Sequence, residues 1–429
     1  MAEPKDVIQV LDSGQPVGAL SSVPNRDYFA FQYFPEWVQN GYSISPILMP
    51  LENRIFAFPE LSRETYQGLP PAIADALPDR FGNAIITAEL QKQGLGYRDI
   101  TPIDRLSYVG KRSMGSLEFK PTFGNSKISN EMLRIGKLVE AARMVLSGDF
   151  KDEDDTSKAV KQIIKIGTSA GGARAKAVIN VDDETGIISS GQFPAESKTG
   201  WLLKFDSMGS DAKLDHGQVG QSEDFCRIEY AYSLMAKEAG INMPETRLLE
   251  EGGRAHFMVR RFDRPSGKRK LGMQSLCGIA AADFNLRGVN DYSILVQTGK
   301  KLELPEEDFI EMFRRLVFNY LAFNCDDHTK NFAFLRGENG VWRLSPAYDV
   351  TFAYDPTNYW LSQHLMGVDG KFQDVTKQDL IEFARHWKIP YAFDVYKKAK
   401  LSISKWREFA KEAGVLDIVA TDIDRLLNN

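Results

Sequence analysis

The sequence predicts an α+β protein with two lobes, a strand-rich one followed by a helical one, preceded by a small α+β N-terminal domain. Three observations predict this architecture. At 429 residues the chain is too long for one ordinary core. Short strand-like runs dominate its middle, and helical periodicity dominates its last part. We expect the N-terminal domain at residues 1–125, the strand-rich lobe at 126–262 and the helical lobe at 263–429.

Composition and charge describe an ordinary globular protein, with 43% hydrophobic and 26% charged residues. The net charge of −5 argues against independent, sequence-blind binding of nucleic acid, which needs a basic surface. The sequence shows neither a signal peptide nor a run of the roughly 20 apolar residues that cross a membrane. Its three cysteines are too few and too scattered for a disulfide framework or a metal site. We therefore expect a cytoplasmic protein without a membrane partner.

The N-terminal domain is expected to combine short strands with a short helix. Val7–Val10 and Val17–Leu20 are typical of strands, and Ser13-Gly14 between them is typical of a turn. Turn residues surround a short helical run between Gly68 and Asp79. The domain is expected to end in two short strands joined by a basic turn, within Tyr108–Phe119.

Periodicity predicts the elements of the two lobes. A helix over Glu131–Leu146 and an exposed acidic linker over 149–155 lead into the strand-rich lobe. The expected strands of this lobe are Ala175–Val181, Gly200–Phe205 and Ala255–Arg261. One amphipathic helix, Ser222–Ala239, interrupts them and is capped by Gly240. Beyond Asp263 the pattern is almost wholly helical.

The most specific motif is Asp326-Asp327-His328-Thr329-Lys330-Asn331, which follows an amphipathic helix over Glu306–Phe323. Asp326 and Asn331 are five positions apart, the spacing between the catalytic Asp and the Mg²⁺-binding Asn of a kinase catalytic loop. Two adjacent carboxylates just past a helix C-terminus face the negative end of the helix dipole. Because this placement costs stability, it favours a functional role. The alternative is a polar turn with His328 satisfied in the core.

Phosphoryl transfer needs further parts, and the sequence offers a candidate for each. Asp349 stands where a second metal carboxylate is expected, on a short hairpin after the loop. Small residues in Gly167–Lys176 would let backbone amides approach phosphates, although a flexible hairpin is the alternative. Lys204 lies in an apolar strand and either reaches phosphates or extends to solvent at a strand edge. Glu229 could pair with Lys204, although a solvated helix glutamate is the more ordinary interpretation.

A charged junction lies where the strand-rich region meets the helical one, at Arg260-Arg261-Phe262-Asp263-Arg264. A hinge at this junction would offer backbone groups of Arg260 and Phe262 to adenine. It would also offer the Asp263 carboxylate to the ribose. The order of the parts along the chain is the order that kinases use.

These motifs resemble those of the HipA kinase family, and the resemblance spans most of the chain. It rests on Ser169–Lys176, Val259–Arg264, Asp326–Asn331 and Tyr348-Asp349, and in the N-terminal domain on Gly18–Leu20, Ala74–Asp79 and Tyr108–Gly110. The resemblance implies an ATP- and Mg²⁺-dependent serine/threonine protein kinase, the toxin of a toxin–antitoxin pair. It implies a host translation protein of the aminoacyl-tRNA synthetase class as substrate. It also implies a HipB-like helix-turn-helix antitoxin as partner, with DNA contacted only through that complex.

The resemblance further implies roles for individual residues. Asp326 would be the catalytic base, with His328 beside it, and Asn331 and Asp349 would bind Mg²⁺. The residues implied in ATP binding are Lys204, Ser169, Ala170, Gly171, Gly172, Lys176, Arg260, Phe262 and Asp263. Ser169 corresponds to the serine that the family autophosphorylates. A phosphate on Ser169 would add roughly −1.5 to −2 charges to a phosphate-binding loop and shut the enzyme down.

Two departures and two rival functions accompany the resemblance. Asp327 stands where the family more often has glycine, and Arg260 where an acidic residue is common. If Asp326 and Asp327 faced each other, the pKa of one carboxyl would rise, although sequence neighbours usually point apart. The rivals are a small-molecule kinase of related fold and a non-catalytic corepressor that binds the antitoxin. The polar segment Asp206–Glu223 suits either a peptide-binding activation loop or a lid.

Overall fold

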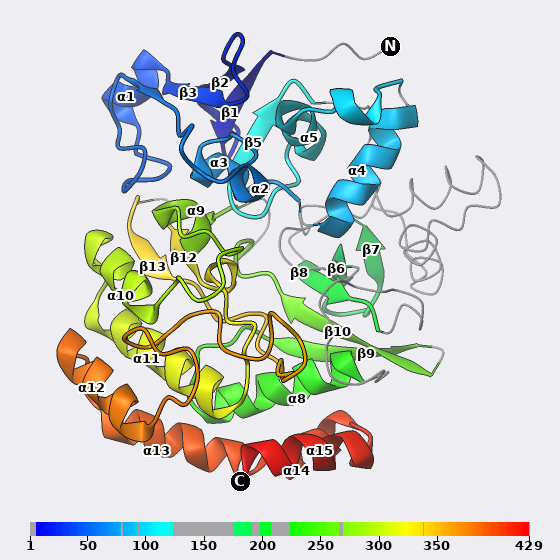
Figure 1. The fold of residues 1–429 in the computed structure, drawn as a ribbon. Coiled ribbons are helices and arrows are strands. Elements are labelled where there is room, and N and C mark those ends of the chain that lie inside the picture. Colours follow the sequence, from blue (N-terminus) through cyan, green and yellow to red (C-terminus); the bar gives the residue numbers. More distant parts are fainter. Residues whose placement is uncertain are drawn as a thin grey trace. The chain divides into compact units, whose positions relative to one another are not determined.

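The structure is a computed structural model of the chain (Figure 1). It describes residues 6–78, 80–92, 94–122, 176–190, 198–206, 224–251, 253–265, 269–337 and 339–428. The helix expected over Glu131–Leu146, the linker expected over 149–155 and the small-residue loop up to residue 175 lie outside the described residues.

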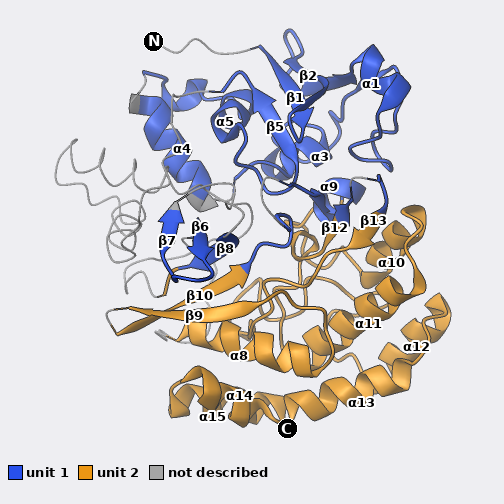
Figure 2. Ribbon diagram, turned by 180° about the vertical axis from the view of Figure 1, so that it is seen from behind, with its two compact units in different colours: residues 1–204, 260–281, 335–341 blue, residues 205–259, 282–334, 342–429 orange. Residues whose placement is uncertain are grey.

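The chain forms two compact units, which Figure 2 shows in two colours. Unit 1 consists of residues 1–204, 260–281 and 335–341, and unit 2 of residues 205–259, 282–334 and 342–429. Each unit is therefore built from segments that are far apart in the sequence. The domain boundaries expected at residues 125 and 262 stay predictions.

Unit 1 contains a five-stranded antiparallel sheet in the order β4-β3-β2-β1-β5. Its strands are β1 (Val7–Asp12), β2 (Gln15–Ser22), β3 (Phe29–Tyr33), β4 (Ile55–Phe56) and β5 (Leu117–Lys120). β1 and β2 confirm the two expected strands, and Ser13 and Gly14 between them both have positive φ angles, as a tight turn requires. Gly18 is required in β2, because a Cβ there would lie 2.3 Å from the Gln32 carbonyl oxygen.

Short helices complete this part of unit 1. They are α1 (Pro35–Asn40), α2 (Arg63–Tyr66), α3 (Pro71–Ala74), α4 (Arg80–Lys92), the 3-10 helix η1 (Tyr97–Asp99) and α5 (Pro102–Val109). α3 confirms the short helical run expected between Gly68 and Asp79. Asp75 follows α3 and accepts hydrogen bonds from the backbone N–H and the hydroxyl of Ser275, both at 2.6 Å.

The expectation of two strands within Tyr108–Phe119 is half wrong. The second strand is β5, but Tyr108 and Val109 end helix α5. Thr101 and Asp104 form a capping box at the start of this helix, and Pro102 occupies its first turn. These start signals lie upstream of the short apolar run, which by itself resembles a strand.

Unit 1 also holds three strands from the middle of the sequence, β6 (Lys176–Asp182), β7 (Ile188–Ser190) and β8 (Lys198–Lys204). β6 pairs antiparallel with both of the others. β6 and β8 confirm two of the strands expected for this region. Further along the chain, β11 (Gly272–Ser275) leads into α9 (Leu276–Ala280), which the Ser275 side chain caps.

Unit 2 contains the antiparallel pair of β9 (Thr246–Glu251) and β10 (Arg254–Arg260) and the helix α8 (Phe225–Glu238). β10 confirms the third expected strand, and α8 confirms the helix expected over Ser222–Ala239. Gly240 follows α8 with a φ of +86°, the left-handed conformation that commonly ends a helix. Tyr232 of α8 is fully buried and packs edge-to-face against Trp406, with ring centroids 5.3 Å apart.

The rest of unit 2 is mainly helical. Its helices are α10 (Tyr292–Lys301), α11 (Glu306–Leu321), the 3-10 helix η2 (Thr329–Asn331), α12 (Lys377–Trp387), α13 (Ala392–Ile403), α14 (Trp406–Ala413) and α15 (Asp417–Leu427). α11 confirms the helix expected over Glu306–Phe323. Within the described residues, no helix is both long and apolar enough to span a membrane.

The expectation of an almost wholly helical pattern beyond Asp263 is wrong in detail. β11, β12 (Ala333–Arg336), β13 (Trp342–Leu344) and the non-helical stretch 345–376 interrupt the helices. β12 and β13 form a hairpin, in which the Gly337 N–H donates to the Val341 carbonyl at 3.0 Å. The two glycines of this turn, Gly337 and Gly340, are a hairpin signal within the sequence. The hairpin expected ahead of Asp349 is therefore present.

Asp263 is a buried junction of unit 1. Its side chain has no exposed surface and accepts hydrogen bonds from Arg261, Arg264 and the Gly115 backbone N–H at 2.7–2.9 Å. Burial by itself would raise the pKa of the Asp263 carboxyl, but the two guanidinium charges outweigh it and hold this pKa well below its usual value. The pair of arginines therefore keeps the carboxylate charged inside unit 1.

Replacing Asp263 tests the strength of this junction. Asp263→Asn leaves two guanidinium groups without their carboxylate in a buried site, so we expect the free energy of unfolding to fall by about 3 kcal/mol. Asp417→Asn is the matched control, because Asp417 has the same 2.7 Å contact with Arg407 but an 87% exposed side chain. Its loss should stay below about 1 kcal/mol. Equal losses in urea unfolding would contradict a structural role for Asp263.

His256 makes the stability of unit 2 depend on pH. It is 1% exposed, and its Nδ1 accepts a hydrogen bond from the Asp206 backbone N–H at 2.9 Å. Burial, followed by the charge of Arg254, lowers its pKa from 6.5 to about 4. The unfolded chain therefore binds more protons than the folded chain between these two values, and folding stability falls as the pH drops through this window.

His256→Asn tests this dependence, since the Asn carbonyl can still accept the Asp206 N–H but does not titrate. We expect the wild-type protein to lose up to about 3 kcal/mol of unfolding free energy between pH 7 and pH 4 through this group. The variant should lose correspondingly less in the same urea series. His386→Asn, at an exposed helix position, should keep the wild-type slope. A His256→Asn slope identical to that of the wild type would contradict the assignment.

Candidate active site

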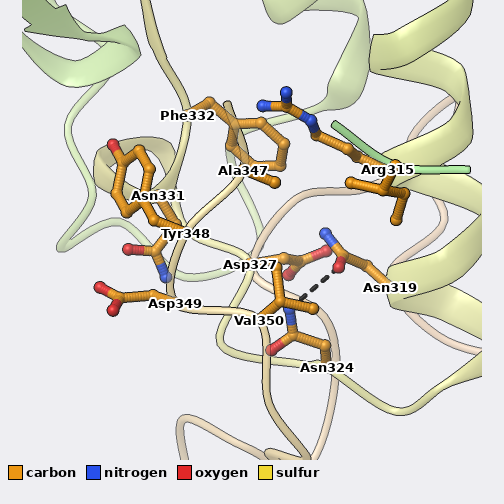
Figure 3. Close-up of a pocket in the computed structure, with 11 residues that line it drawn as sticks. Arg315, Asn319, Asn324, Asp327, Asn331, Phe332, Ala347, Tyr348, Asp349 and Val350 are labelled. Carbon is orange, nitrogen blue, oxygen red and sulfur yellow. Dashed lines mark hydrogen bonds between the residues drawn. The ribbon is translucent and has the colours of Figure 1, made fainter. Parts of the chain in front are cut away.

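Two residues of the expected catalytic loop, Asp327 and Asn331, line a pocket of unit 2 (Figure 3). Asp326–Asn331 connect α11 to β12, and Asp349 follows β13. The pocket is lined by Ile241, Arg315, Asn319, Asn324, Asp327, Asn331, Phe332, Ala347, Tyr348, Asp349 and Val350. The structure thus brings the loop and Asp349 together, as the sequence predicts.

Backbone pairing fixes the start of the loop after α11. Phe323 takes a positive φ of 52°, which turns the chain out of the helix. Cys325 then donates its N–H to the Ala353 carbonyl at 3.1 Å, and the Ala353 N–H donates to the Phe323 carbonyl at 3.0 Å. This short parallel bridge holds the segment that precedes Asp326 beside the segment that follows Asp349.

Asp326 and Asp327 occupy opposite environments. The Asp326 side chain is 43% exposed, whereas the Asp327 side chain has no exposed surface. The two neighbouring carboxylates therefore differ in their access to solvent. His328 lies beside Asp326, with its Nε2 3.9 Å from Oδ1, and packs edge-to-face on Phe284. Asp326 is thus the carboxylate of the pair that a substrate can reach.

Hydrogen bonds orient Asn331 and tie Asp349 to the loop. The Asn331 Nδ2 donates to the Asp326 carbonyl at 2.8 Å, so its Oδ1 is the atom that remains for a ligand. Tyr348 donates its hydroxyl to the Lys330 carbonyl at 2.6 Å and so links the residue before Asp349 to the loop. Figure 3 shows the Asn331 amide and the Asp349 carboxylate on the same side of the pocket.

These two side chains offer an oxygen pair with the chemistry of a magnesium site. Mg²⁺ takes oxygen ligands and is commonly held by one or two protein groups together with substrate phosphates and water. Asn331 Oδ1 and the Asp349 carboxylate fit that donor set. Among the residues that the structure describes, no cluster of three or more His, Cys, Asp or Glu side chains is arranged to hold a metal ion. A fully protein-built metal cage is therefore not found in the described part of the chain.

A buried ion pair supports the segment that leads to Asp349. Glu311 of α11 accepts hydrogen bonds from Arg315 at 2.9 Å and from the Asn242 backbone N–H at 3.0 Å. Arg315 also donates to the Ser345 carbonyl at 2.6 Å, four residues before Asp349. The carbonyl of Asn242 accepts the Ala347 N–H at 2.8 Å. Helix α11 therefore holds both ends of the candidate site.

The expected phosphate-binding lysines lie in unit 1. Lys204 on β8 is directly opposite Lys176 on β6, so both side chains are on the same face of the sheet. They are 6% and 3% exposed, respectively. The alternative of a solvent-extended lysine is therefore wrong for Lys204. The role of the two lysines in phosphate binding stays a prediction.

The other expected nucleotide contacts have mixed outcomes. Ser169, Ala170, Gly171 and Gly172 lie outside the described residues. The junction residues Arg260 and Phe262 lie at and just after the end of β10, Arg260 exposed and Phe262 partly buried. Their backbone contacts with adenine stay predictions.

Two expectations on single acidic residues need correction. Asp263 was expected to contact the ribose, but its carboxylate is fully buried and saturated by Arg261, Arg264 and Gly115. It therefore has a structural role here. Glu229, for which a solvated position was the more ordinary interpretation, is 2% exposed on α8. Its pairing with Lys204 stays a prediction.

Several residues that shape the site were not identified from the sequence. They are Tyr292, Arg315, Asn319, Asn324 and His364. Arg315 and Asn319 could have been identified from the sequence, since both are polar residues within the apolar face of α11. His364 gave none, because its partner Asp327 is 37 residues away in the sequence.

Comparison with known proteins shows which class of fold and which family this is. Residues 8–120 match the family model of the HipA N-terminal domain, and residues 168–421 match that of the HipA-like C-terminal domain. HipA from Shewanella oneidensis MR-1, solved with HipB and its operator DNA, is similar with a TM-score of 0.65 and 17% identity. This likeness covers 98% of the present chain and 96% of that one. The expected fold class, α+β and two-lobed like a kinase after a small α+β domain, is confirmed.

The chain belongs to the HipA family, since the C-terminal family model alone covers more than half of it. A Haemophilus influenzae protein named "Putative kinase" is 29% identical over a match of 138 residues. The match covers 28% of this chain. The match spans about two fifths of that relative's length, 39%. The Helicobacter pylori proinflammatory kinase CtkA gives a TM-score of 0.35 at 12% identity, over 55% of this chain and 88% of that one. A score this low supports no argument about shared structure.

Arg315 and Arg314 provide a matched test of how the site is supported. Both pair with Glu311, but the Arg315 side chain is 4% exposed and the Arg314 side chain 23%. Arg315→Met leaves the mostly buried Glu311 without its buried partner and frees the Ser345 carbonyl, so we expect a loss of about 3 kcal/mol in unfolding free energy. Arg314→Met should cost less than about 1 kcal/mol. The unfolding free energies of both variants are measured by urea unfolding. An equal loss in the two variants would contradict the support role of Arg315.

Proposed function

We propose that this protein is an ATP-dependent serine/threonine protein kinase that acts as the toxin of a toxin–antitoxin pair. The observation that carries the proposal is that Asn331 and Asp349 line one pocket, while the solvent-facing Asp326 lies in the same loop and is bonded through its carbonyl to Asn331. Membership of the HipA family and the kinase-like fold support it. The name of the Haemophilus influenzae relative agrees with it.

Asp326 has the exposure and the position of a general base. Its carboxylate would accept the proton of the substrate hydroxyl while that oxygen attacks the terminal phosphorus of ATP. His328, 3.9 Å from this carboxylate, would hold it in place or bind the acceptor segment. The 2.8 Å hydrogen bond between Asn331 Nδ2 and the Asp326 carbonyl fixes the loop around the base.

Asn331 and Asp349 would hold Mg²⁺ through their oxygen atoms. The ion, when bound, neutralises the charge of the phosphates and of the departing ADP. Lys204, with Lys176 opposite it, would bind the phosphates through positive charge. The small-residue loop with Ser169, Ala170, Gly171 and Gly172 would cover the phosphates with backbone amides. Arg260 and Phe262 would contact adenine through their backbone groups.

The expected partners follow from the family. The Shewanella oneidensis protein was solved with HipB and operator DNA, which supports a helix-turn-helix antitoxin as partner of this chain. The net charge of −5 agrees with DNA contact through the antitoxin rather than by this chain alone. A translation protein of the aminoacyl-tRNA synthetase class is the proposed substrate. Phosphorylation of Ser169 is the proposed means of self-inactivation.

A small-molecule kinase is the second candidate, because the same three side chains would serve a small alcohol as acceptor. A protein kinase modifies itself or another protein, whereas a small-molecule kinase leaves protein mass unchanged. The third reading, a non-catalytic corepressor, has no need of the intact set of Lys204, Asp326, Asn331 and Asp349. These differences make protein mass the discriminating quantity.

The decisive experiment is the intact mass of the purified protein after incubation with Mg²⁺-ATP, followed by peptide mapping. We expect the wild-type protein to gain one phosphate on Ser169. Asp326→Asn should slow this gain at least about 100-fold, because it removes the base. Asp422→Asn, at an exposed position on α15, should react like the wild type.

Two outcomes would contradict the proposal. No phosphate on initially unmodified wild-type protein, and none on any added protein, would favour a small-molecule substrate or a binding role. Equal rates for the wild type and Asp326→Asn would remove Asp326 as the base. A phosphate on a residue other than Ser169 would retain the kinase and reject the proposed switch.

A further inference from the structure

Asp327 is a buried carboxylate of the candidate site, and both of its oxygens contact polar groups. Its Oδ2 accepts the Tyr292 hydroxyl at 2.8 Å and lies 3.0 Å from His364 Nδ1. Its Oδ1 accepts the backbone N–H groups of Leu365 at 2.8 Å and of Met366 at 3.3 Å. A buried charge is tolerated only when donors meet it in this way. The side chain therefore acts as an anchor between the catalytic loop and two other segments.

The first of these segments is helix α10. Tyr292 is its first residue and is 1% exposed. Burial, and then the charge of Asp327, raise the pKa of the Tyr292 hydroxyl well above its ordinary value, so this hydroxyl stays protonated and donates. Asn319 of α11 donates to the same hydroxyl at 2.9 Å, and Asn324 donates to Asn319 at 2.9 Å. Figure 3 shows this last hydrogen bond at the pocket wall.

The second segment is His364–Gly367. The His364 ring stacks on Tyr320 of α11 with centroids 3.7 Å apart. The Tyr320 hydroxyl donates to the Met366 carbonyl at 2.9 Å, and the Tyr292 N–H donates to the Gly367 carbonyl at 2.9 Å. The segment is thus held on the helices around it, and Asp327 is bonded to three of its residues in sequence. Any movement of the catalytic loop would break several of these bonds at once.

From this arrangement we infer that Asp327 is a positioning residue, whose buried carboxylate fixes the catalytic loop so that the adjacent Asp326 faces the acceptor. The inference rests on the proposed function for the role of Asp326. The two neighbours therefore have different roles. Successive side chains point apart along the backbone, so anchoring the Asp327 side chain also fixes the direction of the Asp326 side chain. The Asp327 side chain itself has no exposed surface.

Two substitutions of Asp327 separate anchoring from simple packing. Asp327→Ala removes both carboxylate oxygens, which accept the hydrogen bonds from Tyr292, Leu365 and Met366. Asp327→Asn keeps one carbonyl oxygen for the Leu365 and Met366 N–H groups and can donate to Tyr292 and His364 from its amide. The matched control is Asp291→Ala, because Asp291 joins the start of α10 to the residues just after the second segment, accepting the N–H groups of Ser293 and Gly370. Neither of these contacts involves the catalytic loop.

The experiment measures amide hydrogen exchange without nucleotide and the kinetics of phosphate transfer with Mg²⁺-ATP, both well below the melting temperature. For Asp327→Ala we expect faster exchange in residues 326–331 and 364–367. We also expect kcat to fall about 100-fold with KM for ATP changed less than about threefold, as for a misplaced catalytic group. Asp327→Asn should recover part of kcat. Asp291→Ala should speed exchange near residue 370 and keep kcat within about threefold.

Three results distinguish the inference from the proposed function. Unchanged exchange in both segments of Asp327→Ala would overturn the anchoring, whatever the activity. A kcat loss in Asp291→Ala equal to that in Asp327→Ala would overturn positioning, because general loosening would then explain both. A wild-type protein that transfers no phosphate would overturn the proposed function, and the exchange data would still decide whether Asp327 anchors the loop.

Discussion

A carboxylate can be buried only where donors surround it, and this constraint shapes the candidate site. Asp327 is the clearest case, since α10, the segment after β13 and the catalytic loop all meet at its two oxygens. Once Asp327 is buried, Asp326 is left on the open side of the loop. The chemistry proposed for Asp326 therefore depends on the hydrogen bonds of its neighbour.

The same constraint acts elsewhere in both units. In unit 2, Glu311 joins α11 to the segment before Asp349 through Arg315. In unit 1, Asp263 joins its two arginines to the backbone of Gly115. Each of these carboxylates links segments that are far apart in the sequence. Apolar contacts alone would allow these segments to shift relative to each other. Buried ion pairs add little net stability against apolar replacements, but losing one partner is costly, so they fix a single arrangement.

Local signals predicted much of the fold. Strand alternation and helical periodicity depend on neighbouring residues, and they led to most of the expected strands and helices. The five-residue spacing from Asp326 to Asn331 is also local, and the catalytic roles that it indicates stay predictions. Tyr108-Val109 was assigned to a strand because a short apolar run carries no period, and the capping box that decides the helix lies upstream. The contact of Asp263 with Gly115 and the side-chain contacts of Asp327 with Tyr292 and His364 span 35 or more residues, which no local pattern encodes.

The assignment of the active site depends on where the nucleotide and the metal ion bind. The most direct measurement is a crystal structure with a non-hydrolysable ATP analogue and Mn²⁺ in place of Mg²⁺, with the metal located by its anomalous signal. We expect the metal ion to lie within about 2.2 Å of Asn331 Oδ1 and of the Asp349 carboxylate, with the terminal phosphate facing Asp326. A metal and phosphates bound elsewhere, with Asn331 and Asp349 uncontacted, would contradict the assignment of this pocket as the active site.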